Sequence, residues 1–403
     1  MNNLEDEIRY AVMDEIDLTS EISDEEIREL IRNQIIQISR QRPVSLKERI
    51  SAENHVFNSL RKLDVLEDLL SDESITEIMI NGPDTIFIEK NGRVMLSDEH
   101  FSSEEKLNDI IQNIVAVNNK IVNESNPIVD TRLSDGSRVN IVLKPAAVDY
   151  SIISIRKFPK EQMTMARLES FGSISKEQIE FLEKLVKAGY NIFVSGGTGS
   201  GKTSFLNALG EFIPSDERVI TIEDSAELQL KKVANLVRLE ARSANLEGKN
   251  EISIRDLLKS SLRMRPDRIV VGECRGAEAL EMLQAFNTGH DGSMSTGHSN
   301  SCKDMLSRLE TMVLMGAEIP LPAIRQQIAA GIDIIVQLGR LRDKSRKLLE
   351  ISEVDGIVDN QIVLNTLYRF KEVDEVNGRI VGEWEKVGSL KHIDKLLASG
   401  LEI

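Results

Sequence analysis

The chain is poor in residues on which several classes of protein depend. Of its 403 residues only 4% are aromatic and two are cysteine, while 66 acids against 50 bases leave a net charge of −16. Two cysteines cannot build a disulfide framework, and they form no CxxC pair for zinc or redox chemistry. An acidic chain with few aromatic residues also lacks the basic grooves and stacking platforms of nucleic-acid motors. We therefore expect no direct nucleic-acid contact.

Long apolar runs are missing as well. No uncharged apolar segment approaches the roughly 18 residues that span a bilayer. The first 30 residues contain eleven acids and two bases, so they resemble neither a secretory signal nor a transit peptide. Apolar residues at helical spacing on this charged background predict an acidic helical appendage over residues 1–60. We expect the protein to be cytoplasmic.

Hydrophobic periodicity divides the rest of the chain. Over residues 61–158, short strand-like segments surround one amphipathic stretch, Ser102–Asn118, which predicts an α+β domain with a largely antiparallel sheet. Residues 159–172 are predicted to be a linker. Over residues 173–403, short apolar strands alternate with helices, which predicts a parallel sheet with crossovers. Closing hairpins and a helix over Ser389–Ile403 complete this second domain.

The best-defined strands can be placed from composition and turn residues. Their ranges are Ile75–Ile80, Thr85–Lys90, Arg93–Leu96, Arg138–Leu143, Ser151–Lys157, Asn191–Val194, Val219–Glu223 and Arg268–Gly272, with hairpin strands expected at Ile332–Leu338, Leu348–Val354 and Gln361–Phe370. An Asn91-Gly92 turn is expected to join two of them.

One motif matches the phosphate-loop pattern GxxxxGK[ST] in full. A strand, Asn191–Val194, runs into it and an apolar helix leaves it, which is the context that this motif requires. Main-chain N–H groups of such a loop converge on phosphate oxygens. Lys202 is expected to reach the β- and γ-phosphates, and the Thr203 hydroxyl to bind Mg²⁺. The residues assigned to nucleotide binding are Gly196, Gly197, Thr198, Gly199, Ser200, Gly201, Lys202, Thr203 and Ser204.

Acidic residues end two of the other predicted parallel strands. Glu223 and Asp224 end the first, and Glu273 follows the second. Because ligands of open parallel sheets bind beyond the carboxyl ends of the strands, we expect these acids to face the phosphates. Asp224 has a structural alternative as a helix cap. The candidate metal ligands are thus Thr203, Glu273 and Asp224.

A polar stretch, Thr288–His298, holds two of the five histidines. Their spacing of eight residues, with no cysteine nearby, matches no usual zinc pattern. A polar strand beside the nucleotide fits better, with a histidine donating to phosphate or to a carboxylate. His298 is the candidate.

Arginines supply the remaining positive charge near the predicted strand ends. Because the charge of a triphosphate must be neutralised in the transition state, several arginines are expected to face it. The candidates are Arg132, Arg138, Arg156 and Arg242.

Taken together, these motifs are similar in order and spacing to the Walker A motif, Asp box, Walker B motif and His box of the type II/IV secretion ATPases. The segments Asp130–Asn140 and Leu239–Ser253, the latter containing Glu247-Gly248, resemble the CpaF-type ATPases of tight-adherence (Flp) pilus assembly. The absence of a tetracysteine zinc motif disfavours the type II secretion and type IV pilus extension branch.

The resemblance implies an α/β fold: a RecA-like P-loop ATPase domain preceded by an α+β, PAS-like N-terminal domain. It implies a homohexameric ring that hydrolyses ATP with Mg²⁺ and drives pilus assembly or protein secretion at the bacterial inner membrane. The partners would be inner-membrane platform proteins, through which an acidic chain would reach the membrane peripherally. The alternatives are a type IV secretion traffic ATPase and a RecA-like nucleic-acid motor.

The resemblance also implies roles for individual residues. Either Glu223 or Glu273 would polarise the attacking water while the other serves the metal, and His298 would sense the γ-phosphate. Arg138, with Arg132 or Arg156, would reach the nucleotide from the N-terminal domain.

Overall fold

The computed structural model describes residues 3–16, 22–90, 92–118, 120–158, 162–242, 244 and 249–402. Glu247-Gly248, Asn91 of the predicted Asn91-Gly92 turn, residues 159–161 of the predicted linker and Ile403 lie outside this range. The chain divides into two compact units, Met1–Lys160 and Glu161–Ile403.

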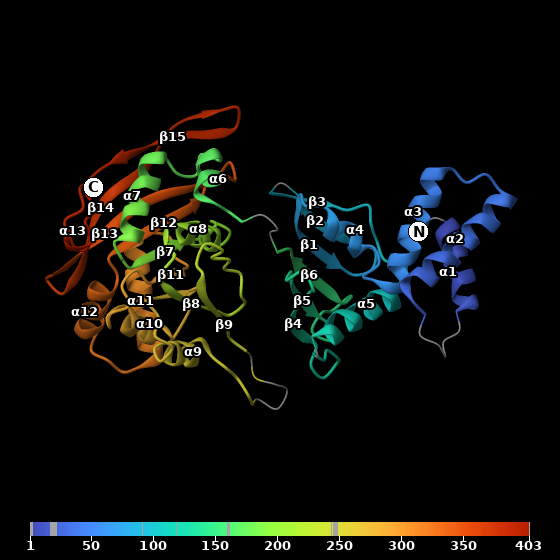
Figure 1. Ribbon diagram of the computed structural model, residues 1–403, viewed down its shortest axis with the longest axis horizontal. Helices are drawn as coiled ribbons and strands as arrows, with labels where there is room; N and C mark the ends of the chain where they lie inside the picture. Colours follow the sequence, from blue (N-terminus) through green and yellow to red (C-terminus); the bar gives the residue numbers. More distant parts are fainter. Residues whose placement is uncertain are drawn as a thin grey trace. The chain divides into compact units, whose positions relative to one another are not determined.

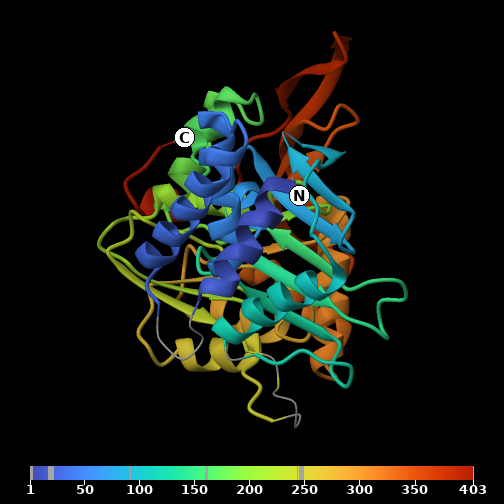
Figure 2. The same ribbon diagram turned by 90° about the vertical axis from the view of Figure 1, so that its right-hand side faces the viewer.

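The first unit begins with three helices, α1 (Asn3–Glu15), α2 (Asp24–Gln41) and α3 (Leu46–Arg61). Capping boxes start α2 and α3, because Ser23 and Ser45 each exchange hydrogen bonds with a glutamate three residues later. The helices pack side by side (Figure 2) around apolar residues at helical spacing, among them Ile8, Val12, Ile27, Ile31, Ile35, Val56 and Phe57. The described part of residues 1–60 is thus largely helical.

A short helix, α4 (Leu66–Ser71), leads into the six-stranded sheet of the first unit. Its strands are β1 (Ile75–Asn81), β2 (Ile86–Lys90), β3 (Arg93–Leu96), β4 (Ile128–Arg132), β5 (Arg138–Val142) and β6 (Ile152–Arg156), in the order β3-β2-β1-β6-β5-β4 (Figure 1). All neighbours are antiparallel, as predicted. Helix α5 (Glu104–Val117) shares one apolar core with the strands. Among the six strands of this sheet, β4 alone was not predicted from the sequence.

The second unit is built on a nine-stranded sheet of order β15-β14-β13-β12-β7-β11-β10-β8-β9. The strands are β7 (Ile192–Gly196), β8 (Arg218–Glu223), β9 (Asn235–Glu240), β10 (Arg268–Val271), β11 (Met294–Gly297), β12 (Ile334–Arg340), β13 (Arg346–Val358), β14 (Gln361–Val376) and β15 (Arg379–Lys386). From β12 to β9 the neighbours are parallel, and from β12 to β15 they are antiparallel. The predicted parallel sheet and closing hairpins are confirmed.

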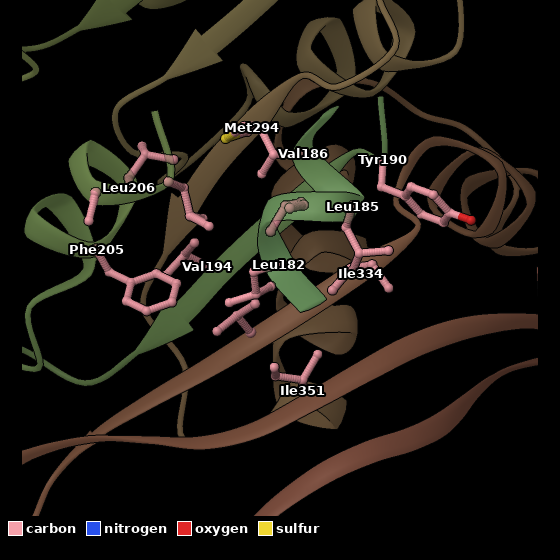
Figure 3. Packing of buried hydrophobic residues seen from close by; sticks show 14 of the residues in the cluster. Leu182, Leu185, Val186, Tyr190, Val194, Phe205, Leu206, Met294, Ile334 and Ile351 are labelled. Carbon is pink, nitrogen blue, oxygen red and sulfur yellow. The ribbon is translucent and has the colours of Figure 1, made fainter. Parts of the chain in front are cut away.

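Apolar cores cover both faces of this sheet. Along β7, Ile192 and Val194 enter one core and Phe193 enters the other, because successive side chains of a strand point to opposite faces. Figure 3 shows the first core, in which Leu182 and Leu185 of a covering helix pack with residues of β7 and β12.

The helices divide between the two cores. The first core takes residues of α6 (Met165–Ser170), α7 (Lys176–Lys187), α8 (Lys202–Leu209) and α13 (Asp394–Ala398), with a 3-10 turn, η1 (Gly210–Phe212), after α8. The second core takes residues of α9 (Ile254–Ser261), α10 (Ala279–Phe286), α11 (Cys302–Gly316) and α12 (Leu321–Gly331).

Two boundaries differ from prediction. Part of the predicted linker over residues 159–172 is helical, since α6 lies there and buries Met165 in the first core. The short terminal helix that was expected within Ser389–Ile403 is α13, which is five residues long and begins only at Asp394. The chain before it is extended because the N–H groups of Lys391 and His392 donate to the buried carboxylate of Glu353. No helix among the described residues has the length and apolar character needed to cross a bilayer.

Candidate active site at the strand ends

The phosphate loop joins the end of β7 to the first turn of α8. Gly199 and Gly201 take φ values of 71° and 93°, the left-handed region that glycine enters without strain. Lys202 is buried, and its ammonium donates to the carbonyl oxygens of Gly196 and Gly197 at 3.1 Å each. The loop therefore presents a helix N-terminus and a buried cation together, an arrangement suited to phosphate.

The order of the strands brings three distant segments to this loop. β11 lies beside β7, β10 lies beside β11, and β8 lies one strand further away. His298 follows β11, Glu273 follows β10, and Glu223 is the last residue of β8. The predicted polar strand is thus β11, and of the two glutamates Glu273 lies on the strand nearer to the phosphate loop.

A chain of contacts joins the loop to Glu273. The ammonium of Lys202 lies 3.3 Å from Nδ1 of His298, and Nε2 of His298 lies 2.9 Å from Oε1 of Glu273. Because an ammonium can only donate, Nδ1 accepts in this contact, which places the imidazole proton on Nε2, the nitrogen nearer to the carboxylate. Burial, followed by the charge of Lys202, lowers the pKa of His298. The imidazole is therefore neutral at pH 7.

Glu273 is held in its ionised form. Burial by itself would raise its pKa, but the hydrogen bond and charge of Arg275, with the charges of His298 and Lys202, bring the pKa below its ordinary value. Nη2 of Arg275 donates to Oε2 of Glu273 at 2.7 Å, and Nη1 lies 3.4 Å from Oδ2 of Asp224. A carboxylate of this kind accepts a proton or binds a hard cation.

Glu223 faces its own loop instead. It is 4% exposed, and Oε1 accepts the N–H groups of Glu227 at 2.9 Å and Leu228 at 3.0 Å. A Cβ at Gly272 would lie 2.7 Å from Cγ of Glu223, so only glycine fits there. Burial raises the pKa of Glu223 to about 7. In these contacts Glu223 orders the chain after β8.

Three of the predicted arginines form one row in the first unit. In the strand register Arg132 is opposite Arg138, and Arg138 is opposite Arg156. Residues directly opposite each other share a face of the sheet, where like charges repel. Glu77 lies 3.9 Å from Arg156 at one end of the row. A row of guanidinium groups is a suitable site for a polyanion.

Arg242 has different surroundings. Its Nε donates to the carbonyl oxygen of Asn250 at 3.0 Å, and its backbone pairs with Ile252. None of its described contacts reaches the phosphate loop, so its predicted role in nucleotide binding has no support from these bonds.

Thr203 and Ser204 lie half-buried on the first turn of α8, and Thr198 is exposed at the tip of the loop. The sequence analysis missed Arg275, although it lies two residues after Glu273 in a recognised motif. Arg346, which donates to the carbonyl of Gly199 in the phosphate loop, and Arg340, which lies opposite it, were not predicted either. Both lie far along the chain from the phosphate loop and belong to no recognised motif.

A complete phosphate loop at the end of a central parallel strand, with a carboxylate and a histidine on adjacent strand ends, is typical of P-loop nucleotide-binding proteins. The chain belongs to the type II/IV secretion system protein family, whose sequence profile matches residues 59–383. This match includes the whole candidate site.

Two relatives and one solved structure illustrate the similarity. A putative conjugal transfer protein of Mycobacterium tuberculosis is 33% identical over 72% of this chain and 83% of its own. The type IV secretion system protein PtlH of Bordetella pertussis is 31% identical over 73% of this chain and 95% of its own. The ATPase DotB of Legionella pneumophila is similar in fold, with a TM-score of 0.52 and 23% identity over 70% of this chain and 78% of its own.

Proposed function

We propose that this protein is an ATP-hydrolysing motor of a bacterial secretion or pilus machine. The observation that carries the proposal is the chain of contacts from Lys202 through His298 to Glu273, at the ends of three adjacent parallel strands. Family membership supports the same conclusion. The reaction is ATP and water to ADP and phosphate.

The residues around the loop suit a nucleoside triphosphate with a divalent cation. Main-chain amides of the loop and the ammonium of Lys202 bind phosphate oxygens. Mg²⁺ would be held by the hydroxyl of Thr203 with Glu273 or Asp224, and it supplies positive charge to the phosphates. Hydroxyl and carboxylate oxygens are the donors that this hard cation prefers, so the residues fit the group.

We assign the activation of water to Glu273 rather than to Glu223. The carboxylate of Glu273 is ionised and lies in contact with His298 beside the loop. The carboxylate of Glu223 accepts hydrogen bonds from the N–H groups of Glu227 and Leu228. Its role is to position the segment that follows β8. His298 links the phosphate-binding ammonium to the water-activating carboxylate and so reports on the γ-phosphate.

The arginine row of Arg132, Arg138 and Arg156 completes the site in this proposal. Guanidinium groups directly opposite one another in the strand register suit a polyanion, and we propose that the triphosphate is that polyanion. Hydrolysis would remove the contacts that the γ-phosphate makes, and the loss of these contacts would release a movement. A homohexameric ring would pass that movement to inner-membrane platform proteins.

For the particular machine we favour assembly of Flp (tight-adherence) pili, on the CpaF-like segment Asp130–Asn140. A type IV secretion traffic ATPase is the second candidate, because the relatives at 31–33% identity are named for conjugal transfer and type IV secretion. Co-purification from cells with a pair of platform membrane proteins and a small pilin would favour the first, and co-purification with a type IV secretion channel the second.

The enzymatic proposal is tested with the purified full-length chain. We expect Mg²⁺-dependent release of phosphate from ATP, and we expect the rate per subunit to rise as the chain assembles into oligomers. Light scattering on the same samples measures the degree of assembly. Glu273→Gln should bind nucleotide without turnover. An assembled wild-type protein that binds ATP but releases no phosphate would contradict the proposal, and stimulation by single-stranded nucleic acid would favour a RecA-like nucleic-acid motor instead.

A further inference from the structure

The turn between β12 and β13 brings two arginines to the phosphate loop. β12 runs parallel to β7, and Leu338 pairs with Gly196 where the loop begins. Two residues later, Arg340 lies directly opposite Arg346 in the β12–β13 register. Both arginines are exposed. They stand at the carboxyl edge of the parallel strands, where open α/β sheets bind their ligands.

Arg346 is bonded to the loop itself. Its Nε donates to the carbonyl oxygen of Gly199 at 2.8 Å, and a Cβ added at Gly201 would meet its Cδ at 3.5 Å. A Cβ at Gly199 would lie 3.9 Å from Nη1 of Arg340. The carbonyl of Gly199 and the N–H of Ser200 belong to one planar peptide. A bond that holds this carbonyl therefore fixes the direction of that N–H, which in this structure donates to the carbonyl oxygen of Gly197 at 3.3 Å.

The three arginines of this turn differ in their ion pairs. Arg342 is paired with Glu372 and Glu375 of β14. Among the residues that the structure describes, no carboxylate forms an ion pair with Arg340 or Arg346. Two guanidinium groups directly opposite each other repel. An anion beside them relieves this repulsion, and phosphate is the anion for which arginine geometry is best suited.

We propose that Arg340 and Arg346 are positioning residues for the phosphates of the bound nucleotide. Arg346 holds the phosphate loop in its binding conformation through Gly199, and the pair supplies positive charge from the β12 side of β7. His298 and Glu273 lie on the β11 side of the same strand. This inference rests on the proposed function, because it assigns residues to the same nucleotide site.

The test measures nucleotide affinity and turnover in the full-length chain. The variants are Arg340→Ala, Arg346→Ala and Arg346→Lys, with Arg342→Ala as the matched control from the same turn. Affinity is measured with a ribose-labelled fluorescent ATP analogue and Mg²⁺. We expect Kd and KM to rise about tenfold in each alanine variant at positions 340 and 346, the size of one charge-assisted hydrogen bond.

The split between KM and kcat separates positioning from general structural damage. We expect kcat to stay within about twofold of wild type, and Arg346→Lys to fall between wild type and Arg346→Ala because it keeps the charge without the guanidinium geometry. Arg342→Ala should bind like wild type. If the melting temperature of Arg346→Ala is well below that of Arg342→Ala, its loss of affinity could reflect unfolding. The nucleotide affinities of Arg346→Lys and Arg340→Ala then test the proposal.

Different failures have different meanings. If wild type binds the analogue, Lys202→Ala does not, and the Arg340 and Arg346 variants bind like wild type, this inference is wrong and the proposed function stands. The same holds if Arg342→Ala loses as much affinity as its neighbours. If wild type itself does not bind the analogue, both the proposed function and this inference fall.

Discussion

The phosphate loop and the arginine row of Arg132, Arg138 and Arg156 both present positively charged side chains, but they are formed in different ways. The loop is one short contiguous segment, and its geometry follows from local glycine conformations and the start of α8. The row is assembled from three strands by their register. A site formed by one contiguous turn can therefore be recognised in a sequence as a motif. A site formed by strand pairing gives only separate candidate residues, because the register that brings them together is not visible in the sequence.

The largest effect is expected on the loop side of this comparison. Lys202→Ala should reduce ATP hydrolysis by at least about a hundredfold, because it removes the buried cation that meets the phosphates. Thermal unfolding should change little, and Lys187→Ala, which removes an exposed lysine paired with Glu183, serves as the control. Turnover at the wild-type rate in Lys202→Ala would remove the loop from the mechanism.

The next effect separates the two glutamates. Glu273→Gln should lower kcat by about 10²–10⁴, the usual contribution of a general base, while leaving the Kd for ATP nearly unchanged. Glu223→Gln should lower kcat by less than about tenfold, because its side chain orders the loop at Glu227 and Leu228. Single-turnover phosphate release checks both variants, and the reverse ranking would exchange the roles assigned to them.

A smaller effect is expected from the arginine row. Arg138→Gln removes the central charge of the row and should lower kcat/KM by about tenfold. Its matched control is Arg93→Gln, on the edge strand β3 of the same sheet. Steady-state hydrolysis and melting temperature are measured for both. Equal kcat/KM in the two variants would mean that the row has no part in turnover.

The smallest effect concerns the dependence of stability on pH. Burial raises the pKa of Glu223 to about 7 from 4.5 in the unfolded chain. The folded protein therefore holds this proton more tightly, and the resulting stabilisation is complete below pH 4.5 and is lost as the pH rises to about 7. A shift of this size corresponds to roughly 3 kcal/mol.

Glu223→Gln cannot titrate, so it should become more stable relative to wild type as the pH is raised from 5 to 8. Urea unfolding of the second unit, followed at several pH values, measures the difference. Parallel stability curves for the two proteins would show that Glu223 does not titrate with this pKa.

Much of the secondary structure followed from short-range signals. Capping boxes at Ser23, Ser45 and Ser175 begin helices where apolar spacing predicts them. The buried strands before the phosphate loop and before Glu273 were equally clear, because they are almost wholly apolar. The edge strand β9 was missed because none of its residues is fully buried and its pattern of exposure is mixed.

What the sequence determined by itself is the chemistry available: a phosphate loop, two acidic strand ends, a polar strand ending at His298, and family membership through motifs in a fixed order. What only the tertiary structure decided is which of these groups meet. The strand order β12-β7-β11-β10-β8 sets His298 and Glu273 on one side of the loop and Arg340 and Arg346 on the other, and leaves Glu223 one strand further away. Strand order depends on how crossover helices bury both faces of the sheet, and that packing is nonlocal.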